Sequence, residues 1–273
     1  MKTRVISALV ALPVLLLPIF FGGALMYIMC LGAGVIGFFE FTKAVNGKIT
    51  KSSIITACFA LPFYIALYFK VYYLLPLLFC VLLVVNMIHL VAKHNEENIN
   101  NITINFFAFS YTIVTFALIA TIRGYENGII LVFPIFLTAF SSDTFAYFGG
   151  RAFGKRKLSP KLSPNKTIEG SISGALASGL IILFYFMYFI NKLNLDLVNL
   201  EVEIIFVVVF FVGVIGACIS QVGDLFASAV KRYTGIKDFG KLIPGHGGIV
   251  DRFDSVIMVA PIYFIVYDIL YKI

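Results

Sequence analysis

Long apolar runs, separated by short polar segments, dominate this 273-residue chain. A helix needs about 20 apolar residues to cross a bilayer, so the pattern predicts about nine transmembrane helices. The expected spans are 5–21, 23–42, 53–69, 71–91, 103–122, 128–149, 171–191, 204–228 and 254–271. Lys70 alone separates the third span from the fourth, so their limits are the least sharply defined. The predicted fold class is therefore an all-α, polytopic integral membrane helical bundle.

Composition supports a membrane protein, since 60% apolar residues and a mean hydropathy of +0.99 exceed what one soluble core would use. All four cysteines lie inside apolar runs without close pairing, which indicates neither a disulfide framework nor a zinc site. The basic and apolar start of the chain is similar to a signal peptide. However, it runs into a second apolar stretch without a convincing cleavage site, which favours a retained first span.

The distribution of basic residues predicts how the helices cross the membrane. With the N-terminus inside, only four of the 21 Lys and Arg residues fall outside, namely Lys70, Arg123, Lys192 and Lys272. Because Lys and Arg concentrate in cytoplasmic segments, we expect a cytoplasmic N-terminus and an outer C-terminus, most simply in the cytoplasmic membrane. The chain has a net charge of +7, but it contains no basic arm interleaved with aromatic residues. We therefore expect no nucleic-acid partner.

Polar residues within the spans gather in the expected cytoplasmic half of the membrane. They are Glu40, Asn86, His89, Asn105, Asp143, Ser220, Gln221 and Asp224. A charged residue at a helix centre costs about 2.5–3.5 kcal/mol, so such residues usually face a partner or a wet cavity. The pattern predicts one polar cavity open to the cytosol. We divide the chain into N-terminal transmembrane helices, 1–125, and a C-terminal catalytic region, 126–273, with cytoplasmic loops 150–170 and 229–253.

The first segment rich in candidate chemistry runs from Ser141 to Gly170. If the helix ends at Gly149, Asp143 lies about 9 Å below that end. The near-repeat KLSP-KLSP favours extended backbone, because residues before proline avoid the helical region. The basic cluster at 155–157 can be a topology signal that attracts anionic lipids. For Asp143 and Lys166 we favour a functional role.

The second segment runs from Ser220 to Ser255. Asp224 shares one helix face with serines four residues to either side, and Lys231 and Arg232 follow about a turn later. An internal ion pair is the structural alternative for Asp224. Asp251 and Asp254 are three residues apart at the start of the last span, where capping of the helix N-terminus is the alternative role of Asp251.

Carboxylates from separate helices beside Lys and Arg favour a hard divalent cation bound through oxygen, and Mg²⁺ fits best. The stretch PGHGG lets backbone amides approach an anion just before a helix N-terminus, which is a recurring arrangement for phosphate. His246 is the only histidine in such a glycine-rich setting. No nucleophile elbow or zinc-ligand pattern is present, so the residues favour metal-assisted phosphoryl or nucleotidyl transfer.

The stretch from Ser228 to Asp254 carries a longer pattern. It reads Ser-x-apolar-Lys-Arg, four residues, Lys-Asp-x-small, two residues, and then apolar-Pro-x-His-Gly-Gly-apolar-x-Asp-Arg-apolar-Asp. This pattern resembles the C-terminal signature of the phosphatidate cytidylyltransferases, or CDP-diacylglycerol synthases, at every fixed position. The segment from Asp143 to Gly170 resembles the family's second well-defined region. The first four spans add little beyond hydrophobicity.

The resemblance implies that a phosphatidate oxygen attacks the α-phosphorus of CTP, giving CDP-diacylglycerol and pyrophosphate without a covalent enzyme intermediate. Asp224 and Asp251 would be the main metal ligands, with Asp254 and Asp143 as secondary candidates. The other expected catalytic residues are Lys231, Arg232, His246 and Arg252, and the expected substrate-binding residues are Lys166, Lys237, Lys241, Gly247 and Gly248. Within these sets, Lys231, Arg232, Lys241 and Arg252 would neutralise phosphate charge. The resemblance also implies a homodimer in contact with membrane lipid.

Three other functions use similar residues. A transporter of a phosphorylated solute also needs intramembrane charge, but its polar residues should follow a route through both leaflets. A CTP-dependent lipid kinase or another lipid cytidylyltransferase could use the same metal and phosphate groups. The acceptor lipid distinguishes these enzymes, and the sequence does not display it clearly.

Overall fold

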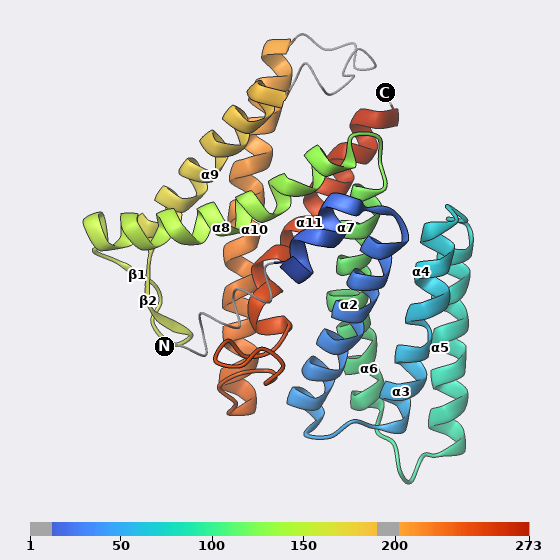
Figure 1. Cartoon of the computed structure of the whole chain (residues 1–273). Coiled ribbons are helices and arrows are strands. Elements are labelled where there is room, and N and C mark those ends of the chain that lie inside the picture. Colours follow the sequence, from blue (N-terminus) through green and yellow to red (C-terminus); the bar gives the residue numbers. More distant parts are fainter. Residues whose placement is uncertain (1–12, 190–201, 273) are drawn as a thin grey trace. The chain divides into compact units, whose positions relative to one another are not determined.

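The computed structural model describes residues 13–189 and 202–272, and its long helices confirm an all-α polytopic membrane protein (Figure 1). The chain forms two compact units. Unit 1 comprises Met1–Gly124 and Tyr233–Arg252, and unit 2 comprises Tyr125–Arg232 and Phe253–Ile273. Helices α10 and α11 therefore each continue from one unit into the other along the chain.

Unit 1 is built on helix α2, which packs against α6, η1 and α7. Besides a helix over 13–21, its elements are α2 (Gly23–Asn46), α3 (Lys51–Cys58), α4 (Ala60–Tyr68), α5 (Leu74–Ala92), α6 (Ile99–Ala108), the π-helix η1 (Phe109–Val114) and α7 (Thr115–Arg123). In Figure 1, α4 and α5 lie side by side within this unit. The third predicted span is thus two short helices, α3 and α4, which join at Phe59.

Buried polar contacts, more than apolar burial, specify helix packing in lipid, because lipid tails are as apolar as leucine side chains. Ser52 and Ser53 of α3 hydrogen-bond to Asn105 of α6 at 3.0 and 2.9 Å. Asn86 of α5 donates to Thr56 at 3.3 Å. Both asparagines are fully buried. The prediction that they line a wet cavity is therefore wrong, because both side chains hydrogen-bond to α3 inside unit 1.

Unit 2 contains four long helices and a small hairpin. Its elements are α8 (Gly128–Phe153), β1 (Lys157–Ser159), β2 (Ser163–Thr167), α9 (Ile168–Phe189), α10 (Val202–Thr234) and α11 (Val250–Lys272). The antiparallel strands pair Lys157 with Thr167 and Ser159 with Ser163. The hairpin confirms the predicted extended backbone at Ser159 and Ser163, the residues before the two prolines, whereas residues 160–162 form the turn.

Helix α8 ends four residues later than the predicted limit at Gly149. Asp143 is ten residues from that end, about 15 Å along the axis by the helical rise, and not 9 Å. The helix continues because its glycines serve packing. A Cβ atom on Gly150 would lie 2.8 Å from the Thr167 hydroxyl, and one on Gly174 would lie 2.5 Å from the Ser142 carbonyl oxygen. Glycine therefore permits close packing of α8 on α9.

Among the described residues, seven helical segments are long and apolar enough to cross a membrane, and they match the second to eighth predicted spans. Residues 5–12 of the first span, 5–21, lie outside the described residues, as do Lys2, Arg4 and Lys192, while residues 13–21 are helical. The ninth, 254–271, is helical as part of α11, but the side chains of its last residues lie outside the described set. Its crossing of the membrane stays a prediction.

Candidate functional site

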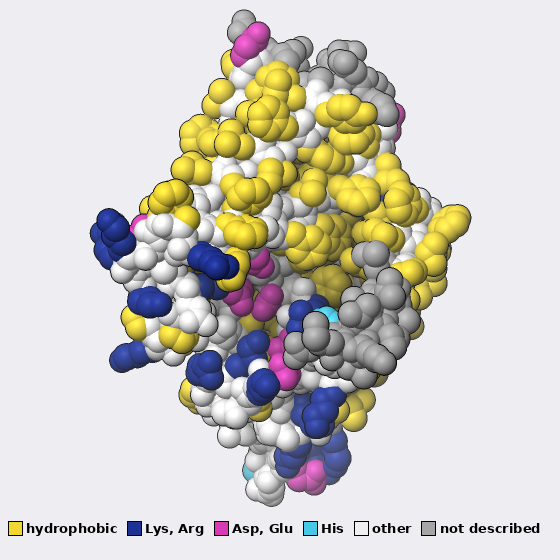
Figure 2. All heavy atoms as spheres, turned by 60° about the vertical axis from the view of Figure 1, so that its left-hand side comes forward, with side chains coloured by type: hydrophobic (Ala, Val, Ile, Leu, Met, Phe, Trp, Pro, Cys, Tyr) yellow, Lys and Arg dark blue, Asp and Glu magenta, His cyan; other side chains and the backbone are white. Residues whose placement is uncertain are grey.

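Three carboxylates predicted as metal ligands come together within unit 2. Asp254, which is 8% exposed, interacts electrostatically with Asp224 and Asp143, and Lys231 also acts on it. Asp143 interacts with Lys166 and Asp224. We call Asp143, Asp224 and Asp254 the acidic cluster. Figure 2 shows acidic side chains next to Lys and Arg on a face that is hydrophobic over much of its remaining area.

The hairpin brings a positive charge to the acidic cluster. Lys166 lies on β2, and its ammonium group donates to Asp224 Oδ2 of α10. Glu169, in the first turn of α9, fixes the open end of the hairpin close to Lys166, because its Oε2 accepts the backbone N–H groups of Lys155 and Arg156 at 3.1 and 3.2 Å. The ion-pair alternative for Asp224 is therefore present, and it uses the lysine predicted to bind phosphate.

Gln221 holds three helices together just beneath the acidic cluster. Its amide nitrogen donates to Ser142 Oγ of α8 at 3.0 Å and to the Ser171 carbonyl of α9 at 3.1 Å. Ser171 Oγ donates to the amide oxygen of the same glutamine. Ser142 directly precedes Asp143, and Gln221 lies about one turn before Asp224. These hydrogen bonds of Gln221 therefore fix the backbone segments that carry the Asp143 and Asp224 carboxylates.

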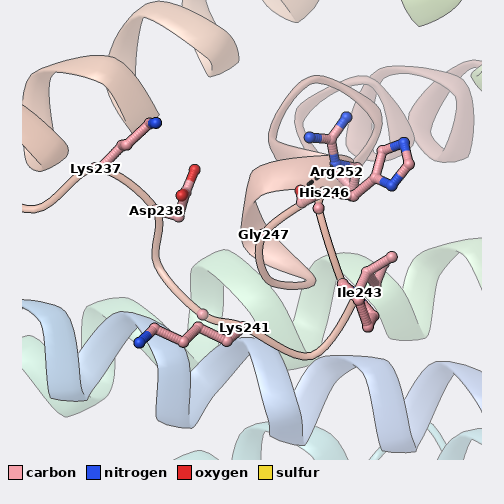
Figure 3. A pocket seen from close by; sticks show the side chains of 10 residues that line it. Lys237, Asp238, Lys241, Ile243, His246, Gly247 and Arg252 are labelled. Atoms are coloured by element: carbon pink, nitrogen blue, oxygen red, sulfur yellow. Dashed lines mark hydrogen bonds between the residues drawn. The ribbon is translucent and has the colours of Figure 1, made fainter. Parts of the chain in front are cut away.

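The second group of predicted site residues lies in unit 1, on residues 237–252, which we call the glycine loop. It lines a pocket of about 680 Å³ that is shown in Figure 3. The charged and histidine side chains that line the pocket are Lys237, Asp238, Lys241, His246 and Arg252. In the figure, Lys237 and Asp238 lie on one side of the loop, while His246 and Arg252 lie together on the other.

A tight turn shapes the glycine loop between Ile243 and Gly247. The Ile243 N–H donates to the Gly247 carbonyl, and the His246 N–H donates to the Ile243 carbonyl, both at 2.9 Å. Gly245 and Gly247 have φ angles of 76° and 86°, which glycine adopts at little cost. Arg252 Nε closes the turn by donating to the His246 carbonyl at 2.6 Å.

Asp251 lies in the first turn of α11, but among the described residues its side chain binds amides of the preceding loop and not the first N–H groups of the helix. Its Oδ2 accepts the N–H groups of Gly248 and Phe239 at 2.9 and 2.8 Å. The backbone amides of His246 and Gly248 thus have acceptors within the loop, although they were predicted to approach a phosphate. Asp251 and Asp254 lie three residues apart on α11, as predicted. Their roles at a metal, and that of the loop amides at a phosphate, stay predictions.

Glu40 is a site residue that sequence reasoning did not select. It lies on α2, more than 190 residues before the glycine loop, and its Oε2 accepts the Val250 N–H at 3.0 Å. The only sequence signal was a carboxylate near the cytoplasmic end of a span, and many such residues have no site role. Only the fold brings this residue to the loop.

The acidic cluster provides the oxygen donors that Mg²⁺ prefers. Ser220 lies one turn before Asp224 on the same helix face, and its buried hydroxyl has no hydrogen-bond partner in the described structure. Within the described residues, no three acidic, histidine or cysteine side chains are already arranged as a metal site. The donor types therefore fit a hard cation, while the ammonium group of Lys166 now contacts one of them.

These features define an integral membrane protein that combines intramembrane carboxylates with a basic, glycine-rich loop at the start of a helix. Comparison with known proteins identifies the group more closely. The model of the cytidylyltransferase family matches residues 2–270. The chain belongs to this family.

Several curated relatives carry the name phosphatidate cytidylyltransferase. The protein from Staphylococcus aureus (strain COL) is 32% identical over 273 residues, covering 96% of this chain and 97% of that protein. The Haemophilus influenzae protein is 42% identical over 141 residues, covering 52% of this chain and 46% of the relative. The Rickettsia typhi protein is 36% identical over 178 residues, covering 61% of this chain and 72% of the relative. The Haemophilus match thus spans about half of each chain.

Proposed function

We propose that this protein is a phosphatidate cytidylyltransferase, which transfers CMP from CTP to phosphatidic acid and releases pyrophosphate. The observation that carries the proposal is the end-to-end similarity to the Staphylococcus aureus protein of that name, together with the complete Ser228 to Asp254 pattern. The bond that forms joins a phosphatidate oxygen to the α-phosphorus of CTP. The bond that breaks is the one between the α- and β-phosphates, whose electrons leave with pyrophosphate.

The chain's own residues would contribute mainly charge and position, as is usual for transfer between phosphates. Lys231 and Arg232 on α10, together with Lys237, Lys241 and Arg252 of the glycine loop, would neutralise the charge of the triphosphate and of phosphatidate. His246 is proposed to contact the reacting phosphates from the Ile243–Gly247 turn. Lys166 would exchange its contact with Asp224 for a substrate phosphate when a cation binds.

We propose Mg²⁺ as the cofactor, held by Asp224 and Asp251 with Asp254 and Asp143 as further ligands. Such a cation, when bound, neutralises phosphate oxygens and orients the leaving pyrophosphate. The mutual repulsion of the acidic cluster supports this proposal, because three neighbouring carboxylates at membrane depth are costly without a compensating positive charge. Lys166 and Lys231 supply part of that charge in the described structure.

We further propose that the loops face the cytosol, where CTP is available, and that the protein acts as a homodimer. The bias of Lys and Arg toward one side of the predicted topology supports the orientation. The homodimer is supported only by the sequence resemblance.

The test is an assay of purified protein in mixed micelles with CTP, phosphatidic acid and MgCl₂. We expect CDP-lipid and pyrophosphate in equal amounts, loss of both with excess EDTA, and recovery when Mg²⁺ is restored. A parallel reaction with diacylglycerol as the acceptor tests the lipid-kinase alternative, which would give CDP and phosphatidic acid. A folded preparation that yields no CDP-lipid from phosphatidic acid would overturn the proposal.

A further inference from the structure

One face of α2 contacts the glycine loop within unit 1. Glu40 and Phe41 lie three and four residues after Gly37, so the three positions share a helix face. The Phe41 ring stacks on Phe239 with a centroid distance of 5.9 Å and an angle of 14°. A Cβ atom on Gly37 would lie 3.5 Å from the Val250 side chain. Gly37 therefore lies within van der Waals reach of the start of α11.

Glu40 explains two glycines of the loop. A Cβ atom on Gly240 or on Gly248 would overlap the Glu40 carboxylate, and the three atoms nearest to each such Cβ all belong to the Glu40 side chain. Neither glycine has a positive φ angle. Both positions therefore favour glycine because of the carboxylate beside them, not because of their backbone conformation. The backbone of the loop fits closely around this one side chain.

Glu40 also acts on the helix that follows the loop. Its Oε2 accepts the N–H of Val250, the first residue of α11. Backbone N–H groups in the first turn of a helix lack partners within the helix, and a negative charge there is favourable. The next residue, Asp251, binds the loop amides of Gly248 and Phe239, and its charge interacts with that of Glu40. Two carboxylates therefore fix the end of the glycine loop.

We propose that Glu40 is a positioning residue, which sets the conformation of the glycine loop in which Lys241, His246 and Arg252 meet the phosphates of the nucleotide. The inference rests on the proposed function for its ligand, whereas the effect on the loop itself does not. Glu40 makes no chemical contribution to the reaction. It acts through the Val250 N–H and through its fit against Gly240 and Gly248.

The kinetic test compares Glu40→Ala and Glu40→Gln with the exposed control Glu203→Ala in the first turn of α10. Glu40→Ala should raise the KM for CTP about tenfold, because small displacements of positioning groups are costly, and the KM for phosphatidic acid is measured alongside. Glu40→Gln keeps an acceptor for Val250 and should recover most of the loss. A fall in kcat with both KM values unchanged would indicate only a smaller folded fraction and would overturn the inference.

A paired substitution tests the fit directly. Gly240→Ala places a methyl group against the carboxylate and should raise the KM for CTP about tenfold by the same displacement of the loop. In the double variant Gly240→Ala/Glu40→Ala, the missing carboxylate leaves room for the methyl group, so the KM should be no higher than that of Glu40→Ala alone. If the KM increase of the double variant equals the product of the increases of the two single variants, the two residues act independently, which would contradict the contact between Gly240 and Glu40.

Amide hydrogen exchange measures the loop without relying on activity. In Glu40→Ala, exchange at Val250 and Gly248 should increase about tenfold or more, because the bond that holds the loop end is lost. The hairpin at 157–167 in unit 2 should be unchanged. Unaltered exchange at both amides would overturn the inference even if the wild-type enzyme is active. If exchange changes but the wild-type protein forms no CDP-lipid, the positioning role stands and the proposed function fails.

Discussion

At the residue scale, Asp224 could have a structural role or a metal-binding role, since it contacts Lys166 and is also a proposed metal ligand. The ion pair alone would make it structural. The neighbouring charges of Asp143 and Asp254 argue for more, because Lys166 and Lys231 together do not balance three carboxylates. A substitution that keeps the shape of the side chain and removes its charge distinguishes the two roles.

We expect Asp224→Asn to lower kcat about 100-fold or more, the usual cost of removing one group that stabilises transition-state charge, while membrane insertion and monodispersity stay normal. Initial rates at saturating CTP and phosphatidic acid measure the effect. Asp268→Asn, near the far end of α11, is the matched control. Near-normal turnover of Asp224→Asn would remove this residue from the metal site.

Glu97 is a second carboxylate whose environment has a measurable consequence. Its side chain is 4% exposed, and burial raises its pKa. The N–H and hydroxyl groups of Ser52 donate to it at 3.2 and 3.1 Å and, together with hydrogen bonds to Asn101 and His89, outweigh burial, so the pKa lies below its ordinary value. A carboxylate with a lowered folded-state pKa stabilises the fold at higher pH and loses this effect on acidification.

We therefore expect the apparent Tm to fall as the pH drops from the ordinary Glu pKa of about 4.3 through the lower folded value. Glu97→Gln should have a lower Tm at pH 7 and a flatter dependence on pH in this window. Thermal unfolding in detergent between pH 3 and pH 7 provides the measurement, with Glu203→Gln as the control. Parallel curves for Glu97→Gln and the wild-type protein would show that Glu97 makes no contribution.

At the scale of elements, the contact of α8 with α9 depends on glycines and small residues, as in many membrane helix pairs. The contact supports the site, because the Ser142 carbonyl faces Gly174 and the next residue along α8 is Asp143. A side chain on α9 would therefore displace the backbone that holds a carboxylate of the acidic cluster.

Gly174→Ala should lower the apparent Tm by several degrees and reduce activity, since overpacking costs about 1–3 kcal/mol. The control is Gly32→Ala on α2, where a Cβ atom would meet nothing within 4 Å. Alanine is about 1 kcal/mol better than glycine in a helix, so this variant should be as stable as the wild-type protein or more stable. Equal losses in both variants would contradict the packing account.

At the scale of the whole molecule, the proposed orientation relies on charge alone. The β1–β2 hairpin and the loop between α7 and α8 should lie on opposite sides of the membrane, because one long helix, α8, separates them. Exposed cysteines at 58, 80 and 218 would first be replaced. Single cysteines can then report the side of each loop.

We expect Lys161→Cys to react with a membrane-impermeant maleimide only in inverted vesicles, and Glu126→Cys only in intact spheroplasts. The reason is that the hairpin carries Lys and Arg, which remain on the cytoplasmic side. Labelling is measured by the mass shift of the purified protein. The reverse pattern would place the hairpin outside and contradict a cytosolic active site.

Local sequence was sufficient for features that depend on composition over one segment. Apolar runs identified the second to eighth spans, because the bilayer fixes both the length and the polarity of a crossing helix. Proline spacing predicted the extended backbone before Pro160 and Pro164, although not the pairing of the two strands. The signature residues from Ser228 to Asp254 identified the family, since they report chemistry that the fold has to preserve.

Contacts between distant segments were decided only by the tertiary structure. A glycine in the sequence can either end a helix or allow close helix packing. The continuation of α8 beyond Gly149 was therefore decided by the packing of α8 against α9. A lone polar residue in a span is equally ambiguous. Asn86 and Asn105 became buried helix contacts, Lys166 reached Asp224, and Glu40 reached the glycine loop. The sequence by itself determined which segments enter the membrane and which chemistry they carry, whereas the partner of each polar group depended on helix packing, because hydrogen bonds act only at short range.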